Sequence, residues 1–545
     1  MGKSILPGFV TPVCSLHALN LLTTIEPHSP DRPGGSSCGG LDAKMGQKLA
    51  RQDVDEGKGV KLYHLQKHED AMKKWSHALR KLKHAEDRFI TMGYMVQAEC
   101  ESGNFKDMLF YALQQIDLAN EKEDAYMRAE AYLNLARANE RLAEFHKTIS
   151  YGKHSLNCQS LDPRTPGYAY LCIGGAYLGF SQFQQALESF ESAMQIANST
   201  SDRLLELQIC VGLGNLFTQI RDLGKAIVFL KNALTLLKTV SIEDVQAKYK
   251  SLILYHLSVA LRKKGAFQDA KSACEEALKI AAENGNKPVQ GRCLHSLGDI
   301  HRDFREGEKT WSKYEASFRL LEEISDRLGQ TGVLGSMAKA AVILPFSTSS
   351  HQHTSHCDCQ AIQLNKKCLE LAKAIGCKLA MLKSHARLQM IYENLNDEES
   401  EEVAKKSVTH LTQEMDLFCN FCGQRFGFKD DSLQALPCSH IFHERCLREY
   451  LGMREKKECP KCKHKQRKST PDLRSKGSSL PILNHTPSGV HHSSENELIA
   501  STSGATTAGG NYTSPTQRKY NTVGYHNTNA VVHSIHSYST TVTDV

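Results

Sequence analysis

The segment Gly174–Ala193, GGAYLGFSQFQQALESFESA, decides the fold of most of this 545-residue chain. A glycine opens it, and Tyr177, Ala186, Phe190 and Ala193 follow at offsets of 3, 12, 16 and 19 residues. The last three positions have the i, i+4, i+7 spacing of one helix face. The segment therefore predicts two antiparallel helices whose backbones approach closely at the small residue.

The same offsets recur elsewhere in the chain, which indicates an internal repeat. The other segments are Gly59-Leu62-Ala71-Trp75-Ala78, Gly214-Phe217-Ala226-Leu230-Ala233 and Ser258-Leu261-Ala270-Cys274-Ala277, with weaker copies at Ala136-Asn139-Thr148-Gly152-Ser155 and Gly298-His301-Thr310-Tyr314-Ser317. The pattern resembles the tetratricopeptide repeat, so we expect an all-α solenoid of six to eight repeats over residues 45–363. A generic helical bundle is the alternative, but it has no reason to reproduce the offsets. A solenoid's concave surface predicts binding partners rather than chemistry.

A second signal lies near the C-terminal third, where eight potential metal ligands occupy one short window. They read C-x2-C-x15-C-x-H-x2-H-x2-C-x12-C-x2-C and are Cys419, Cys422, Cys438, His440, His443, Cys446, Cys459 and Cys462. Zinc favours closed tetrahedral sites of thiolate and imidazole ligands, so eight ligands predict two structural Zn2+ ions and no catalysis by the metal. A disulfide cluster is the alternative, and it would need an oxidising compartment.

The order of these ligands resembles a RING-H2 finger, which we place at residues 416–465. The resemblance implies an interleaved pairing: one zinc would take Cys419, Cys422, His443 and Cys446, and the other Cys438, His440, Cys459 and Cys462. It also implies a second functional hypothesis, a ubiquitin or NEDD8 ligase with no catalytic residue of its own. Phe421, Tyr450 and Pro460 would then form the apolar shelf that docks the conjugating enzyme. Lys463 stands where many active fingers carry an arginine.

The composition describes a soluble protein with an ordinary core, with 40% hydrophobic and 23% charged residues and a formal net charge of +7. Neither a secretory signal nor a run of eighteen apolar residues is present in the sequence, so we expect a cytosolic protein. Clustered aromatic and basic residues and phosphate-binding glycine loops are also missing from it, which argues against nucleic-acid binding.

Three further regions differ in composition from the repeats. Residues 344–359 are rich in Ser, His and Cys and should form an exposed loop that interrupts the last repeat; a metal site there is the less favoured alternative. Residues 364–415 regain helical periodicity and predict last helices or a short coiled-coil connector. Residues 1–44 and 466–545 contain few large apolar side chains and should be disordered.

The repeats, connector and finger together resemble the rapsyn family. The segments that carry the resemblance are YLNLAR at Tyr132–Arg137, EFHKTISY at Glu144–Tyr151 and LQALPCSHIFH at Leu433–His443. The resemblance implies a cytoplasmic postsynaptic scaffold that clusters nicotinic acetylcholine receptors and links them to the cytoskeleton. In that family the repeats self-associate, the connector engages an intracellular receptor helix and the finger contacts dystroglycan-type proteins.

Two short motifs concern the membrane and a further partner. Met45-Gly46-Gln47-Lys48 resembles the family's acylated start, so a myristoyl group could join Gly46 if translation began at Met45; Gly2 is a weaker candidate. Either would make the protein peripheral on the inner face of the postsynaptic membrane. At the other end, Thr543 and the terminal Val545 resemble a ligand for a PDZ protein.

Overall fold

The computed structural model describes residues 57–160, 162–240, 243–344, 353–427, 432–436, 438–452 and 458–462. Residues 57–64 are helical. The helices that follow, up to the finger, are α3 (His68–Leu79), α4 (Ala85–Ser102), α5 (Phe105–Glu121), α6 (Ala125–Arg141), α7 (Phe145–Asn157), α8 (Thr165–Gly179), α9 (Phe183–Thr200), α10 (Arg203–Gln219), α11 (Leu223–Leu237), α12 (Glu243–Lys263), α13 (Phe267–Glu283), α14 (Lys287–Asp303), α15 (Gly307–Glu323), α16 (Arg327–Ile343), α17 (His353–Ile375), α18 (Lys378–Leu395) and α19 (Glu398–Glu414).

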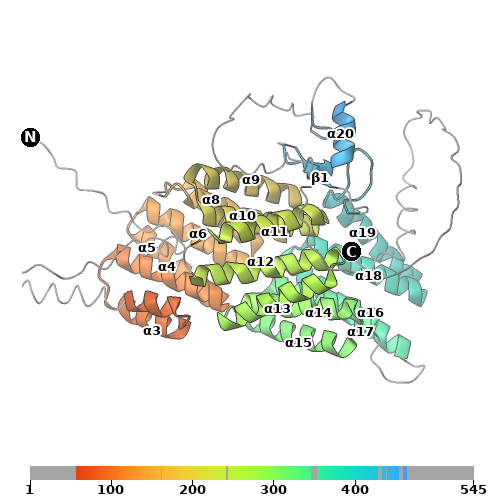
Figure 1. Cartoon of the computed structure of the whole chain (residues 1–545), viewed down its shortest axis with the longest axis horizontal. Helices are drawn as coiled ribbons and strands as arrows, with labels where there is room; N and C mark the ends of the chain where they lie inside the picture. The colour runs from red at the N-terminus through yellow and green to blue at the C-terminus, as the bar shows by residue number, and fades with distance from the viewer. Residues whose placement is uncertain are drawn as a thin grey trace, which may run out of the picture. The chain divides into compact units, whose positions relative to one another are not determined.

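These helices form a solenoid of antiparallel pairs, as Figure 1 shows. Each even-numbered helix from α4 to α18 packs most extensively against the odd-numbered helix that follows it. The even-numbered helices also contact one another in sequence, from α4 and α6 through to α16 and α18, and therefore form one continuous layer. The predicted tetratricopeptide-like solenoid is confirmed, and α18 and α19 continue its pairing.

In several of the helix pairs the small residue meets the large residue that lies sixteen positions later. A Cβ atom built on Gly174 would lie 2.6 Å from Phe190 Cε1, and one on Gly214 would lie 2.6 Å from Leu230 Cγ. Gly298 faces Tyr314 in the same way, at 2.5 Å. The large side chain therefore covers the glycine backbone directly, and a methyl group has no room there.

The turn inside each pair repeats as well. Gly103, Ala143, Ser181, Arg221, Gly265 and Arg305 all end an even-numbered helix with positive φ. At all of these turns except the one at Arg221, the next amide donates to a carbonyl five residues back, for example Glu144 N to Asn139 O at 2.8 Å and Gln182 N to Tyr177 O at 2.8 Å. This is the Schellman arrangement that satisfies carbonyls at a helix end, and glycine adopts it with least strain.

The solenoid also contacts itself between early and late repeats. Phe105 of α5 belongs to the same buried cluster as Trp311 and Leu321 of α15. Arg327 of α16 donates to the Leu142 carbonyl at 2.5 Å and to Glu144 at 2.6 Å. These contacts leave a cavity of about 340 Å³ among the even-numbered helices. Across the described residues no helix is both long and apolar enough to cross a bilayer.

One expectation about the insertion is wrong. Residues 353–359, expected in an exposed loop, form the beginning of α17, and the expected boundary between residues 363 and 364 falls inside that helix. The helix is held by packing on α16, where Cys368 donates to the Thr331 carbonyl at 3.3 Å and Ala361 is fully buried. Tertiary packing can extend a helix over residues whose own propensity favours a loop. Residues 345–352, like most of both chain ends, lie outside the described residues.

Candidate metal centre

The finger is built from two short strands, a helix and a hairpin loop. Strands β1 (Leu433–Ala435) and β2 (Ile441–His443) are antiparallel, and helix α20 (Glu444–Gly452) follows β2 directly. His443 at the end of β2 and Cys446 in the first turn of α20 are three residues apart, so the helix brings them to one side. An isolated bridge between Phe418 and Arg425 closes the loop that carries Cys419 and Cys422.

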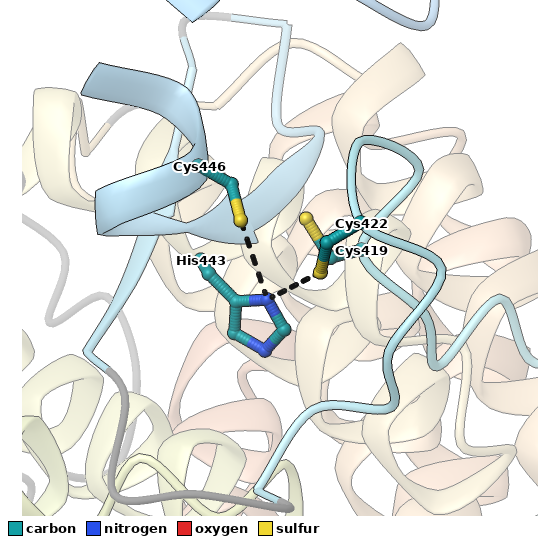
Figure 2. A group of neighbouring side chains, drawn as sticks. All are labelled: Cys419, Cys422, His443 and Cys446. Carbon is teal, nitrogen blue, oxygen red and sulfur yellow. Dashed lines mark hydrogen bonds between the residues drawn. The ribbon is translucent and has the colours of Figure 1, made fainter. Parts of the chain in front are cut away.

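The first group of ligands consists of Cys419, Cys422, His443 and Cys446. Their ligand atoms all lie within 4.8 Å of one another. Figure 2 shows the sulfur atoms around the His443 ring, whose Nδ1 lies 3.4 Å from Cys422 Sγ and 4.0 Å from Cys446 Sγ. Three sulfurs and one imidazole nitrogen in this arrangement form a donor set suited to zinc.

The second group consists of Cys438, His440, Cys459 and Cys462, again with all ligand atoms within 4.8 Å. His440 Nδ1 lies 3.3 Å from Cys438 Sγ and 3.7 Å from Cys459 Sγ. Burial, followed by the neighbouring Cys459 and Cys462 thiols, raises the pKa of Cys438 to about 12. A divalent cation bound between these clustered thiols would stabilise the thiolates and release their protons into solvent.

Of the residues predicted to dock a conjugating enzyme, Phe421 and Tyr450 lie in contact. Phe421 is 38% exposed, and its ring meets the Tyr450 ring edge-on with centroids 6.0 Å apart. Pro460 is half-buried next to the ligand Cys459. Lys463 lies outside the described residues, as do Gly2, Gly46, Thr543 and Val545.

The contacts that hold the finger on the solenoid were not predicted from the sequence. Asp222, in the turn between α10 and α11, accepts from the Leu433 amide at 2.9 Å, and Lys225 donates to the Leu433 carbonyl. The backbone of β1 is therefore satisfied by the solenoid at its first residue. Asp222 also caps α11 by accepting from the Lys225 amide. This local role does not predict its contact with Leu433 in the finger.

A second contact joins the finger to α9. Ser439 donates to Glu191 at 3.3 Å, and Gln184 donates to the Cys438 carbonyl at 3.5 Å. Burial raises the pKa of Glu191 to about 7, and the hydrogen bond from Ser439 opposes that shift. The side of the finger that carries the second ligand group thus faces the solenoid.

A tetratricopeptide-like solenoid followed by a RING-H2 domain with two Cys/His groups defines a class of repeat proteins that carry a zinc-finger domain. Two family models match the chain: the Rapsyn N-terminal myristoylation and linker region at residues 45–126 and the Ring finger domain at residues 417–463. The chain is 34% identical to the 43 kDa receptor-associated protein of the synapse of Tetronarce californica, over 77% of this chain and 98% of that protein. The Gallus gallus protein of the same name is 38% identical, over 77% and 98%. The chain belongs to the rapsyn family.

A further similarity covers a short part of the chain. The chain is 32% identical over 72 residues to E3 ubiquitin-protein ligase RNF181 of Xenopus laevis, which is 13% of this chain and 44% of that protein.

Proposed function

We propose that this protein is a postsynaptic scaffold that clusters nicotinic acetylcholine receptors and links them to the cytoskeleton. The observation that carries the proposal is the similarity to receptor-associated proteins of the synapse over 98% of their length. Solenoid, connector and finger are thus all shared with proteins named for receptor association. The function needs binding surfaces and no catalytic residue.

The solenoid offers a surface for self-association. Phe110 and Leu113 of α5 are 53% and 43% exposed, and they lie three residues apart on one helix face. Exposed apolar side chains that adjoin one another commonly mark protein interfaces. A scaffold whose copies bind one another through α5 would gather the receptors that each copy holds.

The connector offers a different surface for the receptor. Helix α19 carries Glu398, Glu399 and Glu401 in its first turn, while its buried face holds Ala404 and Leu411 against α18. This acidic end suits a basic segment of the receptor's intracellular region. The finger would provide the contact with dystroglycan-type cytoskeletal proteins.

Membrane attachment would come from an acylated amino terminus. The matching myristoylation region begins at residue 45, which favours Gly46 over Gly2 as the acylated residue. One myristoyl chain binds a membrane only weakly and reversibly, so receptor contacts would supplement it on the inner face of the postsynaptic membrane. At the carboxyl end, Val545 would fill the terminal pocket of a PDZ domain and Thr543 would hydrogen-bond beside it.

Clustering can be tested by co-expression with a nicotinic receptor in cells that have no scaffold of their own. We expect large co-clusters with the wild-type chain and dispersed receptors with Phe110→Ser combined with Leu113→Ser, because the apolar contact between copies is lost. Val228→Ser, which changes a 56% exposed valine on α11, is the matched control and should retain clusters. Receptors that stay dispersed with the wild-type chain would count against the proposal.

We also propose that the finger holds two zinc ions, one in each ligand group. Elemental analysis should find about two zinc ions per chain, because each group forms a closed four-coordinate site. Cys438→Ala should unfold the finger and thereby lower the count well below two while the solenoid keeps its thermal transition, because zinc binding supplies the folding energy of so small a domain. Cys359→Ala changes an exposed cysteine on α17 and should leave the count at two. A wild-type ratio of one or less would contradict the proposal.

A RING-type ubiquitin or NEDD8 ligase is the second candidate function. The exposed Phe421 beside Tyr450 favours it, because an apolar shelf of this kind can dock a conjugating enzyme. In a purified ligation assay Phe421→Ala should reduce conjugate formation at least several-fold. Phe304→Ala removes a 37% exposed phenylalanine that lies in the solenoid and should have no effect. Equal conjugation by wild type and Phe421→Ala would exclude this use of the shelf.

A further inference from the structure

The first repeat carries most of the net charge of the chain. Residues 57–84, which include the helical residues 57–64 and α3 and end where α4 begins, contain eight lysine and arginine residues but two aspartate and glutamate residues. Their formal charge is therefore +6, whereas the whole chain carries +7. Charge of one sign that is concentrated in one place attracts partners of the opposite sign.

The basic side chains of this repeat face the solvent. The buried residues of α3 are Ala71, Trp75 and Ala78. Each is followed two residues later by an exposed basic residue, which lies on the opposite face because two residues turn a helix by about 200°. The exposed lysines and arginine that we call the basic surface are Lys58, Lys61, Lys67, Lys73, Lys74, Arg80 and Lys83.

Few carboxylates pair with the basic surface. The acidic residues of the repeat are Glu69 and Asp70, in the first turn of α3. Within the part of the chain that the structure describes, Lys73 is the one member of the basic surface that pairs with a carboxylate, Asp70 at 3.5 Å. Both side chains of that pair are more than half exposed, and exposed ion pairs contribute little. The basic surface therefore keeps a positive potential.

An exposed leucine adjoins the basic surface. The Leu65 amide donates to the Lys61 carbonyl at 3.1 Å, so Leu65 continues the helical spacing of residues 57–64. It follows Lys61 by four residues and Lys58 by seven, which places all three on one face. The Leu65 side chain is 66% exposed. In the described structure this repeat is the first of the solenoid and packs on α4 (Figure 1), so no earlier repeat covers it there.

We propose that the basic surface and Leu65 bind the anionic lipid headgroups of a membrane. Lysine and arginine side chains are attracted to the negative surface potential of anionic lipids, and an apolar side chain among them suits the boundary between headgroups and acyl chains. The repeat suits a nucleic acid less well. Its aromatic residues, Tyr63 and Trp75, are buried and leave no ring on which bases could stack.

The basic surface would supply the second signal that a single acyl chain needs. Gly46, the proposed myristoylation site, precedes residue 57 by eleven residues, which span at most about 40 Å. Acyl chain and basic surface can therefore reach one membrane together, and stable attachment takes a polybasic surface or a second chain beside one myristoyl group. The inference deepens the membrane attachment proposed above, but lipid binding by the basic surface does not require the acyl group.

Lipid binding can be tested by cosedimentation of the full-length, unacylated chain with vesicles, so that the result does not depend on Gly46. The chain should bind vesicles of phosphatidylcholine with phosphatidylserine, should not bind phosphatidylcholine alone, and should be released by salt because salt screens the attraction. Lys73→Gln combined with Lys74→Gln should weaken binding at least tenfold, since each lysine near an anionic surface contributes about fivefold. Lys366→Gln combined with Lys367→Gln removes two exposed charges from α17 and should leave binding unchanged.

A second variant and a second probe complete the test. Leu65→Gln keeps the charge of the basic surface and should weaken vesicle binding several-fold, whereas Val228→Gln, which changes a 56% exposed valine on α11, should not. Three results would each overturn the proposal: equal binding to neutral and anionic vesicles, equal binding by wild type and the Lys73/Lys74 variant, or tighter binding to a duplex RNA than to the anionic vesicles.

Discussion

The rest of this structure depends on the contact between a small residue and a large residue sixteen positions further along the chain. The contact fixes the distance between the two helices of a pair, because the large side chain fills the space that a glycine leaves open. A fixed distance sets how each pair stacks on the next, and the stacking creates the layer of even-numbered helices. The curvature of that layer brings α5 to α15 and closes the solenoid on itself.

One turn of the solenoid also holds the finger, in addition to connecting two helices. The turn after α10 places Arg221 under the finger and Asp222 at the first amide of β1. The finger is therefore held through backbone groups and through the side that carries its second ligand group, while Phe421 and Tyr450 remain partly exposed. An interaction protein benefits from such an arrangement, because one surface is used for internal docking and another is left for partners.

The sequence was enough to predict the solenoid and the membership of both ligand groups in one finger. Offsets of 12, 16 and 19 residues describe contacts within a helix pair, and the metal ligands lie within 44 residues of each other, so both signals are local. The start of α17 was missed because residue type alone does not show that the helix packed on α16 at Cys368 extends back to His353. The docking of Leu433 on Asp222 joins residues 211 positions apart, and no local pattern marks either one.

If the close approach of paired helices at the small residue sets the architecture, a methyl group at that position should destabilise the fold. Thermal unfolding of Gly214→Ala tests this most directly. Alanine is the better helix former by about 1 kcal/mol. Overpacking against the fully buried Leu230 should outweigh that gain and destabilise the chain by about 1–3 kcal/mol. Gly307→Ala, where a Cβ atom meets nothing within 4 Å, should instead stabilise it slightly. If both substitutions stabilise the protein equally, the close approach of the paired helices is not the constraint on which the fold depends.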